Sequence, residues 1–352
     1  MFITGIGTAS PEACYSQKEC WQVFAGSELS NRLEPRSRAI VKKVLNGNNG
    51  ITTRHLVLNN LLEAFELTPD ALHARFLKHA PALATQAAEQ ALSAAGIERR
   101  EIDALIISTC TGYLCPGLTS YVAERLGLRP DVFGLDLVGQ GCGAAVPNLR
   151  VGEALISAGR AQHVLSICVE VCSAALYFDN DPGVLISACL FGDGAGAAVL
   201  SREPGSALRL EWKYSGTVLK PTDRDSLRFE QRNGMLRNIL TPSVPGLAGL
   251  NAKQLFSDVT NAAGIPRGEV KAWALHPGGR DVLVALREAL ELTEHDTRWS
   301  GEVLNRYGNL SSASLYFVLK TALADSAPDG YWWLSSFGAG FSCHGIMLRA
   351  GE

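Results

Sequence analysis

A series of short apolar runs, each bounded by turn residues or helical patterns, leaves this chain few possible folds. In the first part of the chain these runs mostly lack the polar alternation of a strand that meets solvent on one face. Strands of this composition are covered on both faces, so the pattern predicts an α/β fold with a buried sheet. The runs are ALIIST (104–109), VFGLDLV (132–138), HVLSICVE (163–170) and GAGAAVLS (194–201).

The second part of the chain repeats this alternation after a polar, turn-rich segment, SREPGSA (201–207). We therefore expect an internally duplicated α/β architecture with two halves, residues 1–205 and residues 206–352. In the first half, the Ala-rich segment 79–97 is predicted to be a helix that ends at Gly96. In the second half we expect strands at 208–216, 271–276, 331–337 and 342–349, and helices at 250–264, 280–292 and 311–325.

Composition excludes several classes of function. Of the 352 residues, 47% are hydrophobic and the net charge is −3, which argues against a nucleic-acid partner. No apolar run approaches the ~20 residues of a membrane span, and the N-terminus lacks a signal-peptide pattern, so we expect a cytoplasmic protein. The nine cysteines are expected to be reduced thiols. No metal site is expected, because Cys168 and Cys172 lack ligands at suitable spacing.

One cysteine stands out because its neighbours are nearly all small. In DLVGQGCGAAVPNLR, Cys142 lies between Gly141 and Gly143 where a predicted strand ends and a helix begins. Free backbone N–H groups and the helix dipole favour a thiolate there, and small neighbours leave room for an acyl group. The alternative is that the glycines only allow tight packing between strand and helix.

A dinucleotide-binding loop is another interpretation of the same stretch. GQGCGA lacks the third glycine of G-x-G-x-x-G, since Ala144 holds that place. The next strand ends at Glu170, further along than the ribose-binding acid of such a loop. The sequence therefore favours a nucleophile at Cys142 over a nucleotide-binding turn.

Two further residues could complete a nucleophilic site. His276 ends the apolar strand KAWALH and enters a Pro-Gly-Gly turn, which is where α/β folds present catalytic groups. Asn309 lies in the turn of RYGNLSS before a predicted helix, where a helix cap is the alternative. A neutral amide donor can stabilise an enolate without adding a titratable charge. Cys142, His276 and Asn309 thus form a candidate catalytic set.

These residues lie in motifs that resemble the type III polyketide synthases, the chalcone-synthase-like family. The resemblance covers roughly residues 100 to 350, with a weaker match before that. The motifs, in order, are GQGCGAA with Cys142, LFGDGAGAAVL with Phe191, AWALHPGGRDVL with His276, YGNLSSAS with Asn309, and SSFGAGF.

The resemblance implies a thiolase fold, in which two related βαβ-rich halves form a five-layered α-β-α-β-α core, and a homodimer. It further implies that Cys142, kept near its thiolate form by His276, takes an acyl starter from coenzyme A. His276 and Asn309 would bind malonyl-CoA, whose decarboxylation yields the carbanion for repeated Claisen condensation and final cyclisation. Coenzyme A thioesters are then the substrates, and neither a metal nor a bound cofactor is implied.

Departures from the plant enzymes bear on the product. Phe191 matches a gatekeeper phenylalanine, but Asn238 replaces the second one. The Gly-Phe-Gly-Pro-Gly scaffold near the C-terminus reads Ser336-Phe337-Gly338-Ala339-Gly340 here. The combination favours an aliphatic or larger starter and a pyrone, resorcinol or phloroglucinol product. The positions that the resemblance assigns to the pocket are Phe191, Cys110, Cys115, Cys172, Ala175, Asn238 and Ser311; Cys115 matches a residue that reaches into the partner subunit's pocket.

A basic cluster in the N-terminal region is the candidate for binding coenzyme A phosphates, and a solvated helix face is the alternative. The cluster comprises Arg36, Lys42, Lys43 and Arg54.

Two other functions remain open from the sequence. An initiating-class β-ketoacyl-carrier-protein synthase would use the same Cys-His-Asn set for one condensation on a carrier-borne malonyl group. A non-catalytic partner subunit would keep the fold only as a scaffold. The motif around Phe191 and the HPGG turn favour the polyketide synthase.

Overall fold

The structure is a computed structural model that describes residues 1–351. Most strands belong to one large mixed sheet, with two separate two-stranded sheets beside it. In the first half the strands are β1 (Phe2–Ala9), β2 (Cys14–Ser16), β3 (Thr53–His55), β4 (Ala104–Ser108), β5 (Phe133–Leu137), β6 (His163–Glu170) and β7 (Gly194–Ser201). In the second half they are β8 (Leu210–Leu219), β9 (Leu227–Arg232), β10 (Met235–Leu240), β11 (Val270–Leu275), β12 (Gly330–Gly338) and β13 (Ser342–Ala350).

The helices of the first half surround its strands and also form a separate group near the N-terminus. They are α1 (Gln17–Ala25), α2 (Glu28–Arg32), α3 (Pro35–Asn46), α4 (Pro69–Ala95), α5 (Leu118–Leu126), α6 (Ala145–Ser157) and α7 (Pro182–Leu190). The second half contributes α8 (Val244–Ala263), α9 (Arg280–Leu290), α10 (Arg298–Tyr307) and α11 (Ser314–Ala324). Nearly all the strands and helices expected from the sequence are thus confirmed.

The large sheet contains the same pairing pattern twice. Its strand order in the described chain is β11-β12-β13-β8-β1-β7-β6-β4-β5. In the first half β1–β7 and β7–β6 are antiparallel and β6–β4 is parallel. In the second half β8–β13 and β13–β12 are antiparallel and β12–β11 is parallel. The two patterns join where β1 pairs with β8, so the chain folds as two related halves.

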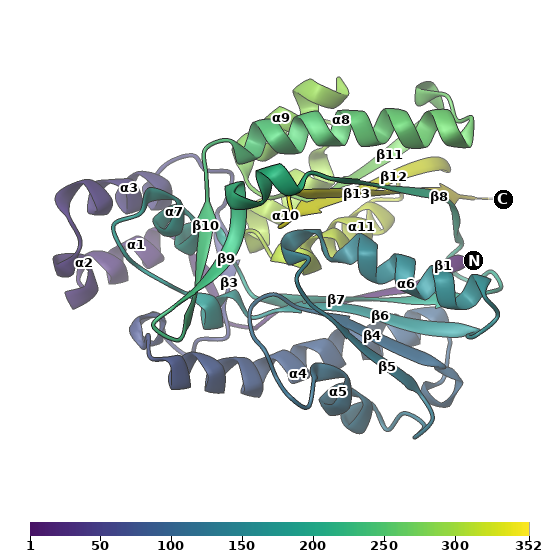
Figure 1. Ribbon diagram of the computed structural model, residues 1–352, viewed down its shortest axis with the longest axis horizontal. Helices are drawn as coiled ribbons and strands as arrows, with labels where there is room; N and C mark the ends of the chain where they lie inside the picture. Colours follow the sequence, from purple (N-terminus) through teal and green to yellow (C-terminus); the bar gives the residue numbers. More distant parts are fainter. Residues whose placement is uncertain (352) are drawn as a thin grey trace.

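Five layers are visible in Figure 1, from α8 and α9 through the two groups of strands to α4 and α5. The middle layer contains α6 and α11, each of which contacts strands of both halves. In the sequence α6 directly precedes β6, and α11 directly precedes β12, which is the equivalent strand of the second half. The segments that lead into these two helices, Gly141–Gly143 and Ser311–Ala313, touch each other, and this contact positions the site.

The predicted Ala-rich helix is part of α4, which lies against β1. A Cβ atom at Gly5 or Gly7 would collide with the carbonyl oxygen of Ala91 or Ala87, so small residues on both elements set this close approach. The helix ends at Gly96, which has left-handed backbone angles, as expected. It begins earlier than predicted, at Pro69, where the Thr68 side chain accepts a hydrogen bond from the Ala71 amide.

The prediction that residues 132–138 form a buried strand is wrong in one respect. These residues form β5, but β5 lies at the edge of the sheet and pairs only with β4. Phe133 is 51% exposed and Val138, just beyond the strand, is 60% exposed. The apolar sequence of a strand does not show whether the strand lies at the centre of a sheet or at its edge.

Several elements were not predicted, among them α7, α10 and the β9–β10 hairpin. In the hairpin sequence LRFEQRNGMLRNIL, Asn233-Gly234 lies between two runs that mix polar and apolar residues. Both turn residues have positive φ, as the tight hairpin turns require. This signal was available in the sequence. Within residues 1–351 no helix is long and apolar enough to cross a membrane.

Candidate active site

The glycines around Cys142 allow two backbone segments to meet. Gly141–Cys142–Gly143 forms a 3-10 turn that leads into α6. A Cβ atom at Gly143 would lie 3.1 Å from the Gly338 nitrogen, and one at Gly141 would lie 3.2 Å from Ala339. The close-packing interpretation is therefore correct for these glycines: they let the end of β12 pass directly beside the cysteine turn.

Burial controls the ionisation of Cys142. The residue is 9% exposed, and the Ser311 hydroxyl donates to its sulfur at 3.2 Å. Burial raises the pKa of the Cys142 thiol to about 12, although the Ser311 hydrogen bond acts in the opposite direction. Burial in the free protein therefore favours the neutral thiol over the resting thiolate that the resemblance implies. Activation of this thiol must accompany substrate binding or proton transfer.

His276 lies directly after β11 and is 1% exposed. Burial lowers its pKa to about 3, so the ring is neutral at physiological pH. Neither ring nitrogen has a hydrogen-bond partner among the residues that the structure describes. The ring packs edge-on against Phe337, with centroids 5.0 Å apart. An unpartnered buried imidazole of this kind is free to accept a proton or to bind a substrate oxygen.

Asn309 links the other two candidates. Its Nδ2 donates to the Gly278 carbonyl at 3.1 Å, two residues after His276. Its Oδ1 accepts from the Ser311 amide at 2.8 Å, and Ser311 in turn donates to Cys142. Ser311 has a φ of 51°, an uncommon angle for a residue with a side chain. The contacts run without interruption from the cysteine turn to the histidine turn, so the structure brings all three candidates together.

Glu170, at the end of β6, is a site residue that the sequence analysis missed. It is fully buried, and its carboxylate accepts from the Cys110 amide at 3.0 Å and from the Thr111 hydroxyl at 2.9 Å. The Ser312 hydroxyl also donates to it, and the Ser311 hydroxyl lies 3.3 Å from it. Burial raises its pKa, although these hydrogen bonds oppose the shift. The signal available in the sequence was a carboxylate at the end of an otherwise apolar strand. Burying such a group is unfavourable unless hydrogen-bond donors surround it.

Most predicted pocket residues surround one small space, here called the inner cavity. It encloses about 20 Å³, roughly the space for one water molecule. The predicted residues that line it are Cys172, Ala175, Phe191, Asn238 and Ser311. Phe191 also pairs through its backbone with Asn309.

A second, larger space of about 590 Å³, here called the outer cavity, lies beside the first. Thr111 and Phe229 line both cavities, and Cys110 lines the outer one. The Cys110 sulfur lies 3.3 Å from the Ser311 hydroxyl. Cys115 is exposed and lines neither space in the single chain described here.

Comparison with known proteins identifies the family. A family model described as FAE1/type III polyketide synthase-like protein matches residues 12–230. A second, for the C-terminal domain of chalcone and stilbene synthases, matches residues 217–350. The chain belongs to the type III polyketide synthases.

Individual relatives match this chain along nearly its whole length. The chain is 30% identical to 3,5-dihydroxyphenylacetyl-CoA synthase of Streptomyces toyocaensis, covering 99% of this chain and 89% of that one. It is 27% identical to the alpha-pyrone synthesis polyketide synthase-like Pks18 of Mycobacterium tuberculosis, covering 98% and 90%. The crystal structure of 1,3,6,8-tetrahydroxynaphthalene synthase from Streptomyces coelicolor superposes with a TM-score of 0.89 at 22% identity, covering 100% of both chains. The expected thiolase fold is confirmed.

The basic residues assigned to coenzyme A divide into two kinds in this polyketide synthase. Arg36, Lys42 and Lys43 lie exposed on α3, as a phosphate site requires. Arg54 is buried, and its guanidinium donates to the carbonyls of Ala188 and Phe191. This arginine supports the Phe191 segment from inside and faces no solvent-borne phosphate, so its assignment is corrected.

The raised pKa of Cys142 in this polyketide synthase predicts a characteristic pH dependence. Iodoacetamide reacts with thiolate, and below a thiol's pKa the thiolate fraction rises about tenfold per pH unit. With a pKa of about 12, alkylation of Cys142 is expected to accelerate steadily from pH 6 to pH 10. Peptide mass spectrometry of the alkylated protein would measure this, with the exposed Cys14 as internal reference. A rate that levels off below pH 7 would instead reveal a resting thiolate–imidazolium pair.

Proposed function

We propose that this polyketide synthase transfers an acyl group from a coenzyme A thioester to Cys142 and extends it with malonyl units. The observation that carries the proposal is the unbroken chain of contacts from Cys142 through Ser311 and Asn309 to the His276 turn. This chain borders the small inner cavity, which Phe191 and Asn238 also line.

Loading follows binding of the thioester, when the Cys142 thiol gives its proton to the neutral His276 ring. The sulfur then attacks the thioester carbonyl, and the coenzyme A thiolate leaves and takes the proton from the imidazolium. The low pKa of His276 supports this return step, because a buried imidazolium readily releases its proton. The product is an acyl-Cys142 thioester with a neutral histidine.

Extension requires a carbanion at the same site. The His276 ring and the second Nδ2 hydrogen of Asn309 bind the thioester oxygen of malonyl-CoA, so that loss of carbon dioxide leaves a stabilised enolate. The enolate carbon attacks the acyl-Cys142 carbonyl, a carbon–carbon bond forms, and the Cys142 thiolate leaves. The extended chain is reloaded, and it finally cyclises to a pyrone, resorcinol or phloroglucinol type of product.

Coenzyme A carries every substrate in this scheme, so the reaction needs no metal and no bound cofactor. Exposed Arg36, Lys42 and Lys43 on α3 supply the positive charge for its phosphates. The proposal places the protein in the cytoplasm, where acyl-CoA substrates and reduced thiols are found.

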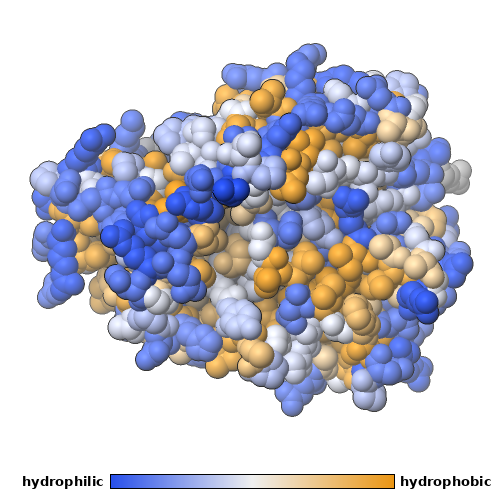
Figure 2. Space-filling view, viewed as in Figure 1, coloured by the Kyte–Doolittle hydropathy of each residue, from blue (hydrophilic) through white to orange (hydrophobic). Residues whose placement is uncertain are grey.

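A homodimer is part of the same proposal. The β5 edge leaves backbone groups unpaired, with Phe133, Val138 and Tyr113 exposed near it. Apolar side chains gather on this face of the molecule, over α6 and β5 (Figure 2). Cys115, which is exposed in the single chain, would reach the partner's pocket. Sedimentation equilibrium should give the mass of two chains; the mass of one chain would contradict the dimer.

The two halves divide, in this proposal, at residues 1–205 and 206–352. The loop between β7 and β8 supports this boundary, because the repeated strand pattern restarts there. The two family models instead overlap at residues 217–230, inside and just after β8. The structural repeat reflects the duplication, whereas the family models describe stretches of related sequence.

The purified protein with malonyl-CoA and a panel of acyl-CoA starters, without carrier protein, tests the proposed function. We expect cyclised polyketides by liquid chromatography and mass spectrometry, together with an acyl adduct on Cys142. Strict dependence on a carrier protein would indicate the initiating-class synthase instead. Absence of any adduct and product across the panel would indicate a non-catalytic scaffold.

A further inference from the structure

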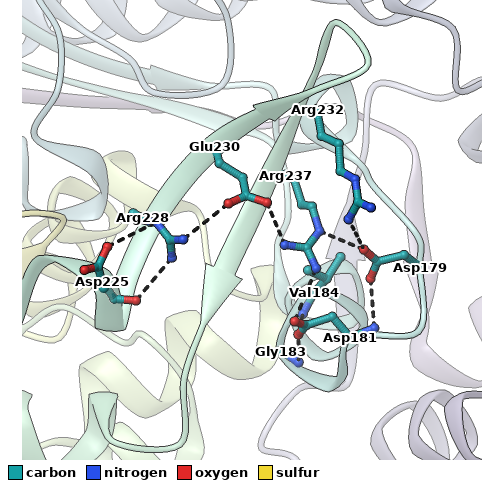
Figure 3. Close-up of polar contacts among 9 residues, drawn as sticks. All are labelled: Asp179, Asp181, Gly183, Val184, Asp225, Arg228, Glu230, Arg232 and Arg237. Carbon is teal, nitrogen blue, oxygen red and sulfur yellow. Dashed lines mark hydrogen bonds and ion pairs between the residues drawn. The ribbon is translucent and has the colours of Figure 1, made fainter.

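A cluster of charged residues joins the β9–β10 hairpin to the start of α7 (Figure 3). At its centre Arg237 contacts three carboxylates: Asp179 at 2.7 Å, Glu230 at 2.8 Å and Asp181 at 3.2 Å. The Arg237 side chain is only 9% exposed. Charge pairs of an arginine shielded from water in this way are worth more than exposed ones.

Through this cluster Arg237 joins the hairpin to α7. Glu230 lies opposite Arg237 on the neighbouring strand, whereas Asp179 and Asp181 precede α7. Asp181 has two functions, since its Oδ1 accepts from the Gly183 and Val184 amides at the start of the helix. Its Oδ2 pairs with Arg237. The first turn of α7 and the hairpin are therefore held by the same carboxylate.

The opposite face of the hairpin lines the cavities. Successive residues of a strand point to opposite faces, so Asn238 faces away from the side that Arg237 occupies. Asn238 pairs with Phe229 across the hairpin, and both line the inner cavity. Phe229 also lines the outer cavity, so it stands between the space of about 20 Å³ and the space of about 590 Å³.

Helix α7 forms the facing wall of the inner cavity. Val184, Ser187 and Ala188 line it from this side. The two walls approach closely at their ends, where a Cβ atom at Gly183 would collide with the Leu240 carbonyl oxygen. Outside its own pairing the hairpin belongs to no larger sheet, so contacts such as the Arg237 cluster set its distance from α7.

We propose that Arg237 is a positioning residue that limits the length of the acyl chain this enzyme accepts. By holding the hairpin against α7, it keeps Phe229 between the two cavities and the inner cavity small. The inference rests on the proposed function, in which the inner cavity receives the acyl chain. Without the arginine, three carboxylates remain close together and repel, so the hairpin separates from α7 and the two cavities join.

The test compares Arg237→Met with Arg232→Met. Arg232 lies on the same hairpin but is 57% exposed and reaches only Asp179, at 3.8 Å. For each protein, kcat and KM are measured with butyryl-CoA and dodecanoyl-CoA as starters. In Arg237→Met we expect the dodecanoyl-to-butyryl ratio of kcat/KM to rise about tenfold. In Arg232→Met the ratio should remain that of the wild type.

A second variant guards against misfolding of Arg237→Met. Asp181→Asn keeps a side-chain oxygen to cap α7 but removes one carboxylate partner of Arg237. It should shift the starter ratio in the same direction by a smaller factor. An unchanged ratio in a folded Arg237→Met, or in Asp181→Asn where Arg237→Met does not fold, overturns the proposal.

Hydrogen exchange distinguishes failure of this inference from failure of the proposed function. If Arg237 holds the hairpin against α7, amides of Met235–Leu240 exchange faster in Arg237→Met than in Arg232→Met, whether or not any polyketide forms. Equal exchange in the two variants contradicts the positioning role of Arg237. Faster exchange with no product from the wild-type enzyme contradicts the proposed function alone.

Discussion

Cys142→Ala is expected to lower product formation by about 10⁴-fold or more, because Cys142 is the proposed carrier of the acyl chain. The fold should survive the change. Ser311, which donates to the Cys142 sulfur, also lies 3.3 Å from Glu170 and so keeps an acceptor. Loss of one small buried atom costs about 1 kcal/mol. Product analysis measures the loss of activity, and intact-protein mass spectrometry measures the loss of the acyl adduct. Thermal unfolding measures the stability of the fold.

The informative competitor for Cys142 is Cys110. Its sulfur also lies beside Ser311, and burial raises its pKa well above the ordinary value. Cys110→Ala should therefore keep the acyl adduct that Cys142→Ala loses. Condensation retained by Cys142→Ala, or an adduct that moves to Cys110, would falsify the nucleophile assignment.

Asn309→Ala is expected to slow decarboxylation of malonyl-CoA by about 10²- to 10³-fold, the usual effect of removing one oxyanion donor. Loading of Cys142 should change far less, because the amide is proposed to act on the malonyl oxygen. The two steps are measured separately, by release of carbon dioxide and by the mass of the acyl adduct.

The control for Asn309 is Asn309→Asp, which preserves shape. The aspartate keeps an oxygen for the Ser311 amide but loses the donor to the Gly278 carbonyl and to substrate. It should decarboxylate as poorly as the alanine variant. Rapid decarboxylation by Asn309→Asp, or equal slowing of loading and decarboxylation in Asn309→Ala, would remove the amide from the mechanism.

The local chemistry of the site was predictable because its residues lie at chain features with clear signals. Cys142, His276 and Asn309 each occupy a junction between a strand or turn and the next element, marked by glycine or proline. Glu170 was missed because its partners, such as Ser312 and Thr111, come from other elements of the chain. A buried carboxylate acquires its meaning from donors that only the fold assembles.

Ionisation was the other point that the sequence could not decide. A cysteine at a helix start predicts a thiolate when the helix dipole dominates. In the structure burial dominates for both partners, raising the pKa of Cys142 and lowering that of His276. The depth of a residue depends on the packing of both halves, which no local pattern records.

By itself the amino-acid sequence determined the two-fold alternation of strands and helices, the catalytic candidates and the family. These properties follow from short-range patterns of residue type and spacing. Only the tertiary structure decided that β5 is an edge strand, that Arg54 is internal and that Arg237 joins the hairpin to α7. Each of these depends on contacts between residues far apart in the chain, and such contacts exist only once the two halves have packed.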